Sequence, residues 1–269
     1  MASSQGVLTR VVAYIRPVAP TPSDDLVPAP ASGRVFTTSR RVSIADATPD
    51  GRMEFDAIAR FLQDAGNDDT DDAGLVELGL AWIARRAVFE VIVPARARES
   101  LGIETWCSGT GSRWAERRTR LTGEHGALIE AAMLWIHIDT QTGRPQKWGS
   151  EFADTYLPAA EGREVTARLQ HPKRPPEPGE TNEMRFTFRQ TDMDAFAHVN
   201  NAAYLAILEE SLGGNSPASS VRVEVEWRTP SVAGEELTVR EVIGEDGVLA
   251  WVVRDDEVRA TYAFRPLTD

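Results

Sequence analysis

Two hydrophobic periodicities alternate along the chain and predict its secondary structure. Between Phe55 and Leu62, apolar side chains recur at i, i+3, i+4 and i+7, which predicts one buried face of a helix. From Val221 to Trp227, apolar and polar side chains alternate strictly, as in an antiparallel strand with one buried face. Similar patterns predict further strands at residues 35–44, 88–93, 103–107, 113–121, 128–138, 185–189, 237–243, 248–254 and 258–265.

These elements fall into two units that share one order: a strand, a turn, a helix, then several strands. Residues 45–65 can be laid on residues 191–211 without a gap, which pairs Gln63 with Glu209. Element order and overlay together indicate a duplication. We therefore expect an α+β fold, in which two copies of one long helix wrapped by an antiparallel sheet pack as a pseudo-dimer.

Proline and polar residues mark the boundaries of the two units. The segment from His171 to Gly179 is too rich in proline for a helix or a central strand. The acidic run Asp68–Asp72 is predicted to be a solvated loop. The chain then divides into a disordered leader at 1–33, a first domain at 34–158, a linker at 159–183 and a second domain at 184–269.

Composition excludes several classes of function. The 269 residues carry a net charge of −12, which disfavours nucleic-acid binding. No apolar run approaches the ~18 residues of a membrane helix, so we expect no membrane insertion. One cysteine and four widely spaced histidines leave no disulfide and no zinc-type ligand set. The expectation is a cytoplasmic protein without metal or cofactor.

Arginines cluster locally despite the acidic balance. Arg113, Arg117 and Arg118 lie close together in the first unit. Alternating arginines often decorate the solvent face of a strand. They can also form a basic patch that docks an anionic partner, because the local field matters more than net charge.

The densest set of reactive side chains precedes the helix of the second unit. A helix N-terminus presents backbone N–H groups and a partial positive charge, which suit an oxyanion. Asp194 and His198 lie just upstream, within reach of a carbonyl bound there, and Asn200 lies beside them. Asp192 and Asn201 have a simpler interpretation as helix-capping residues.

This loop carries a family resemblance. Residues Asp192 to Tyr204 read Asp-x-Asp-x-x-x-His-Val-Asn-Asn-x-x-Tyr, which resembles the active-site loop of hotdog-fold thioesterases. In the first unit, Thr105–Gly109, Arg113–Arg118 and Trp135–Pro145 resemble the N-terminal domain of acyl-acyl-carrier-protein (acyl-ACP) thioesterases. Over residues 34–266 the resemblance implies two tandem hotdog domains and hydrolysis of fatty acyl thioesters, releasing free fatty acid in fatty acid biosynthesis. It places catalysis in the second domain, and its partners would be acyl carrier protein or CoA.

The motif departs from the plant members of the family at three positions. Asp194 and His198 match their catalytic Asp and His, but Phe196 replaces an Asn between them. Pro230 and Ser231 stand where those enzymes have Glu and Cys. A cysteine–histidine mechanism therefore cannot operate in the second domain.

The only cysteine cannot substitute for the missing one. Cys107 lies in the other unit, where the simplest interpretation is a small buried hydrophobic residue.

A carboxylate mechanism remains, as the resemblance to single-domain hotdog thioesterases implies. Asp194 would act as nucleophile or as general base on water. His198 would orient the carboxylate or the water, or protonate the leaving thiolate. Backbone N–H groups near Asn200–Ala202 would bind the thioester oxygen, with Asn201 supporting the loop. Lesser roles remain open for Ser231 and for Glu209, which with Glu210 otherwise reads as a surface charge.

The first copy lacks this machinery, because Thr48 falls opposite Asp194 and Arg52 opposite His198. Its apolar residues would line an acyl tunnel or simply form a core. The candidates are Phe55, Ile58, Leu62, Trp82, Phe89 and Trp135.

Three other functions remain open at this point. The substrate could be acyl-CoA instead of acyl-ACP. A hotdog dehydratase or hydratase also uses Asp/His or His/Glu pairs, although the His-Val-Asn-Asn segment disfavours it. A non-catalytic acyl-thioester-binding protein would explain the departures from the motif, whereas retention of Asp194 and His198 argues against it. A homodimer is left open.

Overall fold

The computed structural model describes residues 26–75, 81–177, 179–213, 217 and 220–267. Ten strands form one antiparallel sheet, in the order β1-β3-β4-β5-β2-β7-β10-β9-β8-β6. The strands are β1 (Val35–Arg41), β2 (Ala81–Val93), β3 (Ser100–Thr110), β4 (Trp114–Gly123), β5 (Leu128–Ile138), β6 (Asn182–Thr187), β7 (Val221–Trp227), β8 (Glu236–Gly244), β9 (Gly247–Arg254) and β10 (Glu257–Pro266). The α-helices are α1 (Phe55–Asp72), α2 (Ser150–Ala160) and α3 (Ala203–Leu212).

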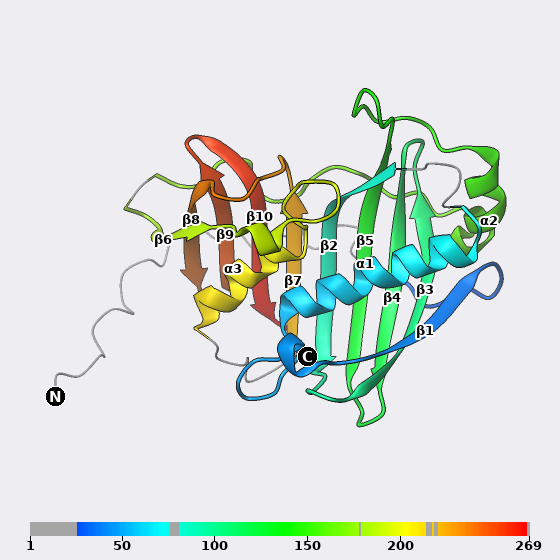
Figure 1. The fold of residues 1–269 in the computed structure, drawn as a ribbon, viewed down its shortest axis with the longest axis horizontal. Helices are drawn as coiled ribbons and strands as arrows, with labels where there is room; N and C mark the ends of the chain where they lie inside the picture. The colour runs from blue at the N-terminus through cyan, green and yellow to red at the C-terminus, as the bar shows by residue number, and fades with distance from the viewer. Residues whose placement is uncertain (1–25, 76–80, 178, 214–216, 218–219, 268–269) are drawn as a thin grey trace.

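The strand order is a mirror image about its centre, where β2 pairs with β7. Phe89 lies opposite Val223 in this pair, and Ala87 lies opposite Val225. In Figure 1, α1 and α3 cross the same face of the continuous sheet, one over each half. The expected α+β fold of two tandem hotdog units packed as a pseudo-dimer is confirmed.

The hydrophobic core lies between these two helices and the sheet. Phe55 and Ile58 on α1 and Leu205 on α3 are buried in one cluster with residues of both halves. The Phe55 ring packs against Phe89 and Phe264, with ring centroids 6.0 Å away in each case. Since Phe264 belongs to the second half, the start of α1 already bridges both units.

The other face of the sheet carries α2, which the sequence patterns did not predict. Trp82 lies here and stacks on Phe152 of α2, with ring centroids 4.9 Å apart. Trp82 therefore faces away from α1 and cannot line a tunnel beneath that helix. Phe55, Ile58, Leu62 and Phe89 are buried core residues, which is the simpler of the two expectations.

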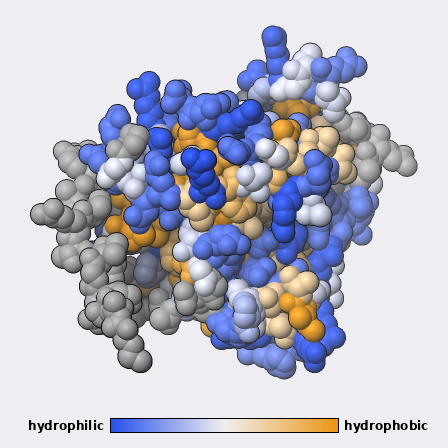
Figure 2. Space-filling model, turned by 60° about the vertical axis from the view of Figure 1, so that its left-hand side comes forward, coloured by the Kyte–Doolittle hydropathy of each residue, from blue (hydrophilic) through white to orange (hydrophobic). Residues whose placement is uncertain are grey.

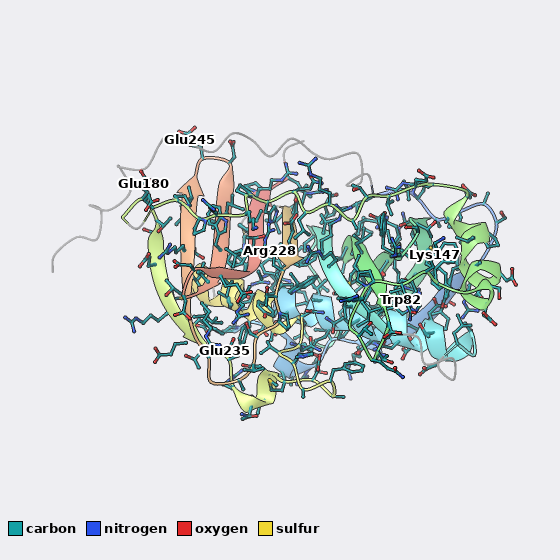
Figure 3. All side chains as sticks on the ribbon, turned by 90° about the horizontal axis from the view of Figure 1, so that it is seen from above. Trp82, Lys147, Glu180, Arg228, Glu235 and Glu245 are labelled. Atoms are coloured by element: carbon teal, nitrogen blue, oxygen red, sulfur yellow. The ribbon has the colours of Figure 1, made fainter. Side chains whose placement is uncertain are left out.

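The linker covers the same outer face near the centre of the sheet, opposite α1 and α3 (Figure 3). The His171 ring contacts Thr261 Oγ1 at 2.9 Å, and the Trp251 indole N–H donates to the Pro172 carbonyl. The polar side of β7 is consequently buried, so the prediction of one solvent-facing side for this strand was wrong. Burial would raise the pKa of Glu224, but His171 and Arg222 lower it to about 2.

Part of the predicted leader also packs against the first half. The Arg118 guanidinium is buried, with 1% of the side chain exposed, and donates to the Val27 and Ala131 carbonyls. It also pairs with Glu130 at 2.7 Å. Residues 26–33 thus belong with the first domain, because a buried guanidinium needs acceptors for its N–H groups. The prediction for residues 1–25 lies outside the described residues.

The acidic run at residues 68–72 is not a solvated loop, because α1 continues through it to Asp72. Asp69 is 1% exposed and faces two guanidinium groups. Arg34 Nε lies 2.6 Å from Asp69 Oδ1, and Arg117 Nη1 pairs with Oδ2. This buried carboxylate ties the end of α1 to β4 and to the segment before β1.

Most of the surface in Figure 2 is hydrophilic, with hydrophobic residues gathered in small separate areas. Among the described residues, no helix is both long enough and apolar enough to cross a membrane.

We predict that Asp69→Asn lowers the free energy of unfolding by about 3 kcal/mol, because it removes the buried anion shared by the half-buried guanidinium groups of Arg34 and Arg117. Urea denaturation measures the loss. Asp71→Asn removes an exposed charge from the same helix and should leave the midpoint nearly unchanged. Equal stability of both variants would contradict a structural role for Asp69.

Candidate active site

The candidate site lies in a loop that occurs twice in the fold. In the second domain, the Asp194 N–H donates to the His198 carbonyl at 2.9 Å, and the Thr48 N–H donates to the Arg52 carbonyl at 2.8 Å in the first. The Asn200 N–H donates to the Asp192 carbonyl just as the Glu54 N–H donates to the Asp46 carbonyl. These hydrogen bonds reproduce the overlay over residues 46–54 and 192–200.

A tight turn brings Asp194 and His198 to the two ends of one short segment. The turn is closed by the Ala197 N–H, which donates to the Asp194 carbonyl at 3.1 Å. Ala197 has φ of 60°, and the equivalent Gly51 has φ of 85°, so both copies need the left-handed conformation here. Asp194 Oδ1 accepts the Phe196 N–H at 2.9 Å, which fixes the carboxylate on the loop.

Exposure within this turn differs from residue to residue. Phe196 is 82% exposed at the tip of the turn, and the His198 side chain is also exposed. Asp194 is half-buried. A carboxylate and an imidazole can thus meet a substrate that approaches from solvent.

The backbone leading into α3 leaves one N–H group available. Asn200 accepts the Ala202 N–H with its side chain at 2.8 Å, and its carbonyl accepts the Ala203 N–H at 2.9 Å. Asn200 therefore closes the turn that leads into α3. Within the described residues, no hydrogen bond uses the Asn201 N–H. Of the three N–H groups expected to bind an oxyanion, only that of Asn201 is not already used inside the loop.

Ser231 and Tyr204 hold the loop through hydrogen bonds on its buried side. The Val199 N–H donates to the Ser231 carbonyl at 3.0 Å, and the Ser231 N–H donates to the Tyr204 hydroxyl at 3.1 Å. Ser231 is 0% exposed, and burial raises the pKa of Tyr204. The indole N–H of Trp227 donates to the Asn201 carbonyl at 3.2 Å. Ser231 thus holds the loop in place and does not face its solvent side.

Glu209 is not a surface charge, because it forms an ion pair across the two domains. Its carboxylate accepts two N–H groups of Arg52, at 3.0 and 2.6 Å. It also accepts the Phe55 N–H at the start of α1, at 2.7 Å. Sequence reasoning placed Arg52 opposite His198 but gave no sign that Glu209 would reach it from α3.

Two of the three arginines expected to dock a partner are internal. Arg118 is buried against Glu130, and Arg117 pairs with Asp69, so neither guanidinium is available to another protein. Both side chains point toward carboxylates of the fold: Arg118 toward Glu130 on β5, and Arg117 toward Asp69 on α1. Arg113 is exposed.

Two tandem units of one helix on antiparallel strands define a double hotdog protein. The family model described as acyl-ACP thioesterase N-terminal domain matches residues 33–156, and that of the C-terminal domain matches residues 176–259. The chain belongs to the acyl-ACP thioesterase family and is a thioester hydrolase.

Individual relatives agree with this assignment. An uncharacterized protein of Mycobacterium tuberculosis is 31% identical over 90% of this chain and 96% of its own. The chloroplast oleoyl-acyl carrier protein thioesterase of Coriandrum sativum is 23% identical over 78% of this chain and 67% of its own. The 12:0-ACP thioesterase of Umbellularia californica has the same fold, with a TM-score of 0.69 and 18% identity over 87% of this chain and 98% of its own.

Cys107 should be inert in the native protein. It is 3% exposed, and burial raises the pKa of its thiol to about 11. Below that pH the thiol stays protonated, whereas alkylating reagents attack the thiolate. At pH 8 we expect iodoacetamide to label Cys107 only after denaturation, as mass spectrometry would detect. Rapid native labelling with loss of activity would instead return this cysteine to the mechanism.

Proposed function

We propose that this protein hydrolyses fatty acyl groups carried on acyl carrier protein and releases the free fatty acid, as a step of fatty acid biosynthesis. The observation that carries the proposal is the loop at residues 194–201. It offers a carboxylate, an imidazole and an uncommitted backbone N–H at one helix start. The family membership supports thioester hydrolysis as the reaction.

In this proposal, Asp194 supplies the carboxylate for the reaction. It either takes a proton from the attacking water or attacks the thioester carbon itself, in which case water then releases the acyl group. The carbonyl oxygen gains negative charge and accepts the Asn201 N–H at the positive end of α3. When the carbonyl re-forms, the C–S bond breaks and His198 gives a proton to the departing thiolate.

The first domain contributes no equivalent chemistry in this proposal. Thr48 occupies the position of Asp194 and is buried, with its hydroxyl donating to the Arg52 carbonyl at 3.0 Å. Arg52 occupies the position of His198 and is paired with Glu209. The first domain therefore serves to hold the acyl chain and the fold, while the second performs hydrolysis.

An acidic carrier protein is the proposed partner, with CoA as the alternative carrier of the same acyl group. The chain is itself acidic, so a docked carrier needs local positive charge near the site. Arg113 is exposed, and so is Arg189, which begins the turn ahead of the loop and pairs with Asp192 at 3.0 Å. These two arginines replace the buried pair in the docking hypothesis.

We expect Asp194→Asn to reduce acyl-thioester hydrolysis at least ~100-fold with unchanged circular dichroism and melting temperature, because an amide can neither attack nor accept a proton. Thiol release from an acyl-thioester series measures turnover. Glu210→Gln removes an exposed carboxylate from α3 and should retain full activity. Turnover of Asp194→Asn within a few-fold of wild type would move the reaction to another group.

Carrier preference is tested by salt and by charge reversal. If an acidic carrier docks electrostatically, kcat/KM for acyl-ACP should fall steeply between low and physiological salt, while a short acyl thioester without the carrier responds little. Arg113→Glu with Arg189→Glu should lower kcat/KM for acyl-ACP ~10-fold or more by slowing association. Lys173→Glu with Arg174→Glu makes the same charge change on the exposed linker and should have no effect. Equal salt dependence of both substrates would favour CoA or a small thioester.

A further inference from the structure

The first-domain loop is occupied by a carboxylate from the second domain. Glu209 Oε1 receives the Phe55 N–H at 2.7 Å and Arg52 Nη1 at 3.0 Å. Phe55 is the first residue of α1, and its N–H group is the equivalent of the Asn201 N–H in the second-domain loop. In the inactive copy, an anion therefore already lies where the active copy would stabilise the oxyanion.

The pseudo-two-fold relation identifies the residue that takes this place in the active copy. It exchanges Arg52 with His198, Phe55 with Asn201 and Glu209 with Gln63 in the gapless overlay of residues 45–65 on 191–211. The loop hydrogen bonds reproduce this register over residues 46–54 and 192–200, and the overlay extends it into the helices. Gln63 lies on α1, is half-buried, and belongs to a helix that packs against α3. Glu209 reaches from α3 to the first-domain loop, and by the same symmetry Gln63 would reach from α1 to the second-domain loop.

We propose that Gln63, from the otherwise non-catalytic first domain, completes the active site by donating its side-chain N–H to the thioester oxygen beside the Asn201 N–H. The inference rests on the proposed function and adds a substrate-contacting residue to it. As water or Asp194 attacks the carbonyl carbon, the C=O electron pair moves to oxygen. That oxygen then accepts N–H groups from both domains until the C–S bond breaks.

The difference between Gln63 and Glu209 explains why only one copy can act. A carboxylate at this position accepts the helix N–H and fills the oxyanion site, as Glu209 does. A neutral amide has two N–H donors and does not compete for that N–H as a charged acceptor would. At this position, a carboxylate blocks the oxyanion site of the first domain, whereas an amide would add a hydrogen-bond donor to that of the second.

Kinetics provide one arm of the test. Gln63→Ala should lower kcat ~100-fold with KM within a few-fold, because removal of one oxyanion donor acts on the transition state. Gln63→Glu should lose at least as much, with an unchanged or higher melting temperature, because its carboxylate would fill the site. Asn67→Asp adds the same charge one turn further along α1, on an exposed residue, and should keep wild-type kcat.

A second arm does not depend on turnover. In Gln63→Glu, the Asn201 amide resonance should show a titration step between pH 4 and 7 that is absent from wild type and from Asn67→Asp, both of which keep the other ionisable groups of the loop, Asp194 and His198. If wild type hydrolyses thioesters but Gln63→Ala and Gln63→Glu keep kcat within threefold, the inference is overturned and the proposed function stands. An Asn201 resonance that ignores the introduced carboxyl overturns it too. A wild type without turnover contradicts the proposed function alone, because the resonance still reports on the geometry.

Discussion

The pairing of β2 with β7 is the constraint on which the rest of the molecule depends. It joins two five-stranded halves into one sheet, with Phe89 opposite Val223 and Ala87 opposite Val225. A shift of one residue would turn the apolar side chains of β7 to the wrong face. With this register, α1 and α3 share one face, and the first-domain loop meets Glu209 of α3. The proposed role of Gln63 is the reciprocal contact, from α1 to the second-domain loop.

Duplication followed by divergence accounts for the asymmetry of the two loops. Both keep the same backbone hydrogen bonds and the same left-handed residue, Gly51 in one and Ala197 in the other. In the first, buried Arg52 and Glu209 form an ion pair that also fastens the start of α1. A buried pair of this kind is costly to break and contributes to the specific packing of the two halves. Among the residues that the structure describes, none forms such a pair with the second loop, which keeps exposed His198 beside half-buried Asp194.

Periodicity predicted the strands, both loop-to-helix segments and the duplication, because these depend on local pattern. It failed where distant segments meet. The alternation in β7 indicated a solvated face, but the linker packs there and buries Arg222 and Glu226 in ion pairs. The run at 68–72 looked like a loop because five polar residues in a row hide that Asp69 neutralises arginines from elsewhere in the chain. Arg118 was expected on the surface for the same reason: its acceptors, Glu130 and the Val27 carbonyl, are distant in sequence.

For the site itself, the sequence identified the residue types, and the structure showed which of their polar groups are not already used in hydrogen bonds within the loop. The motif placed Asp194 and His198 before a helix, which was enough to suggest thioester chemistry. It could not show that the Asn200 side chain accepts the Ala202 N–H, because an asparagine that closes a turn and a functional one look alike in sequence. Once that bond is counted, one backbone N–H at Asn201 remains for an oxyanion. A single donor is a weak oxyanion hole, and this is the physical reason for the proposal that Gln63 of α1 supplies another.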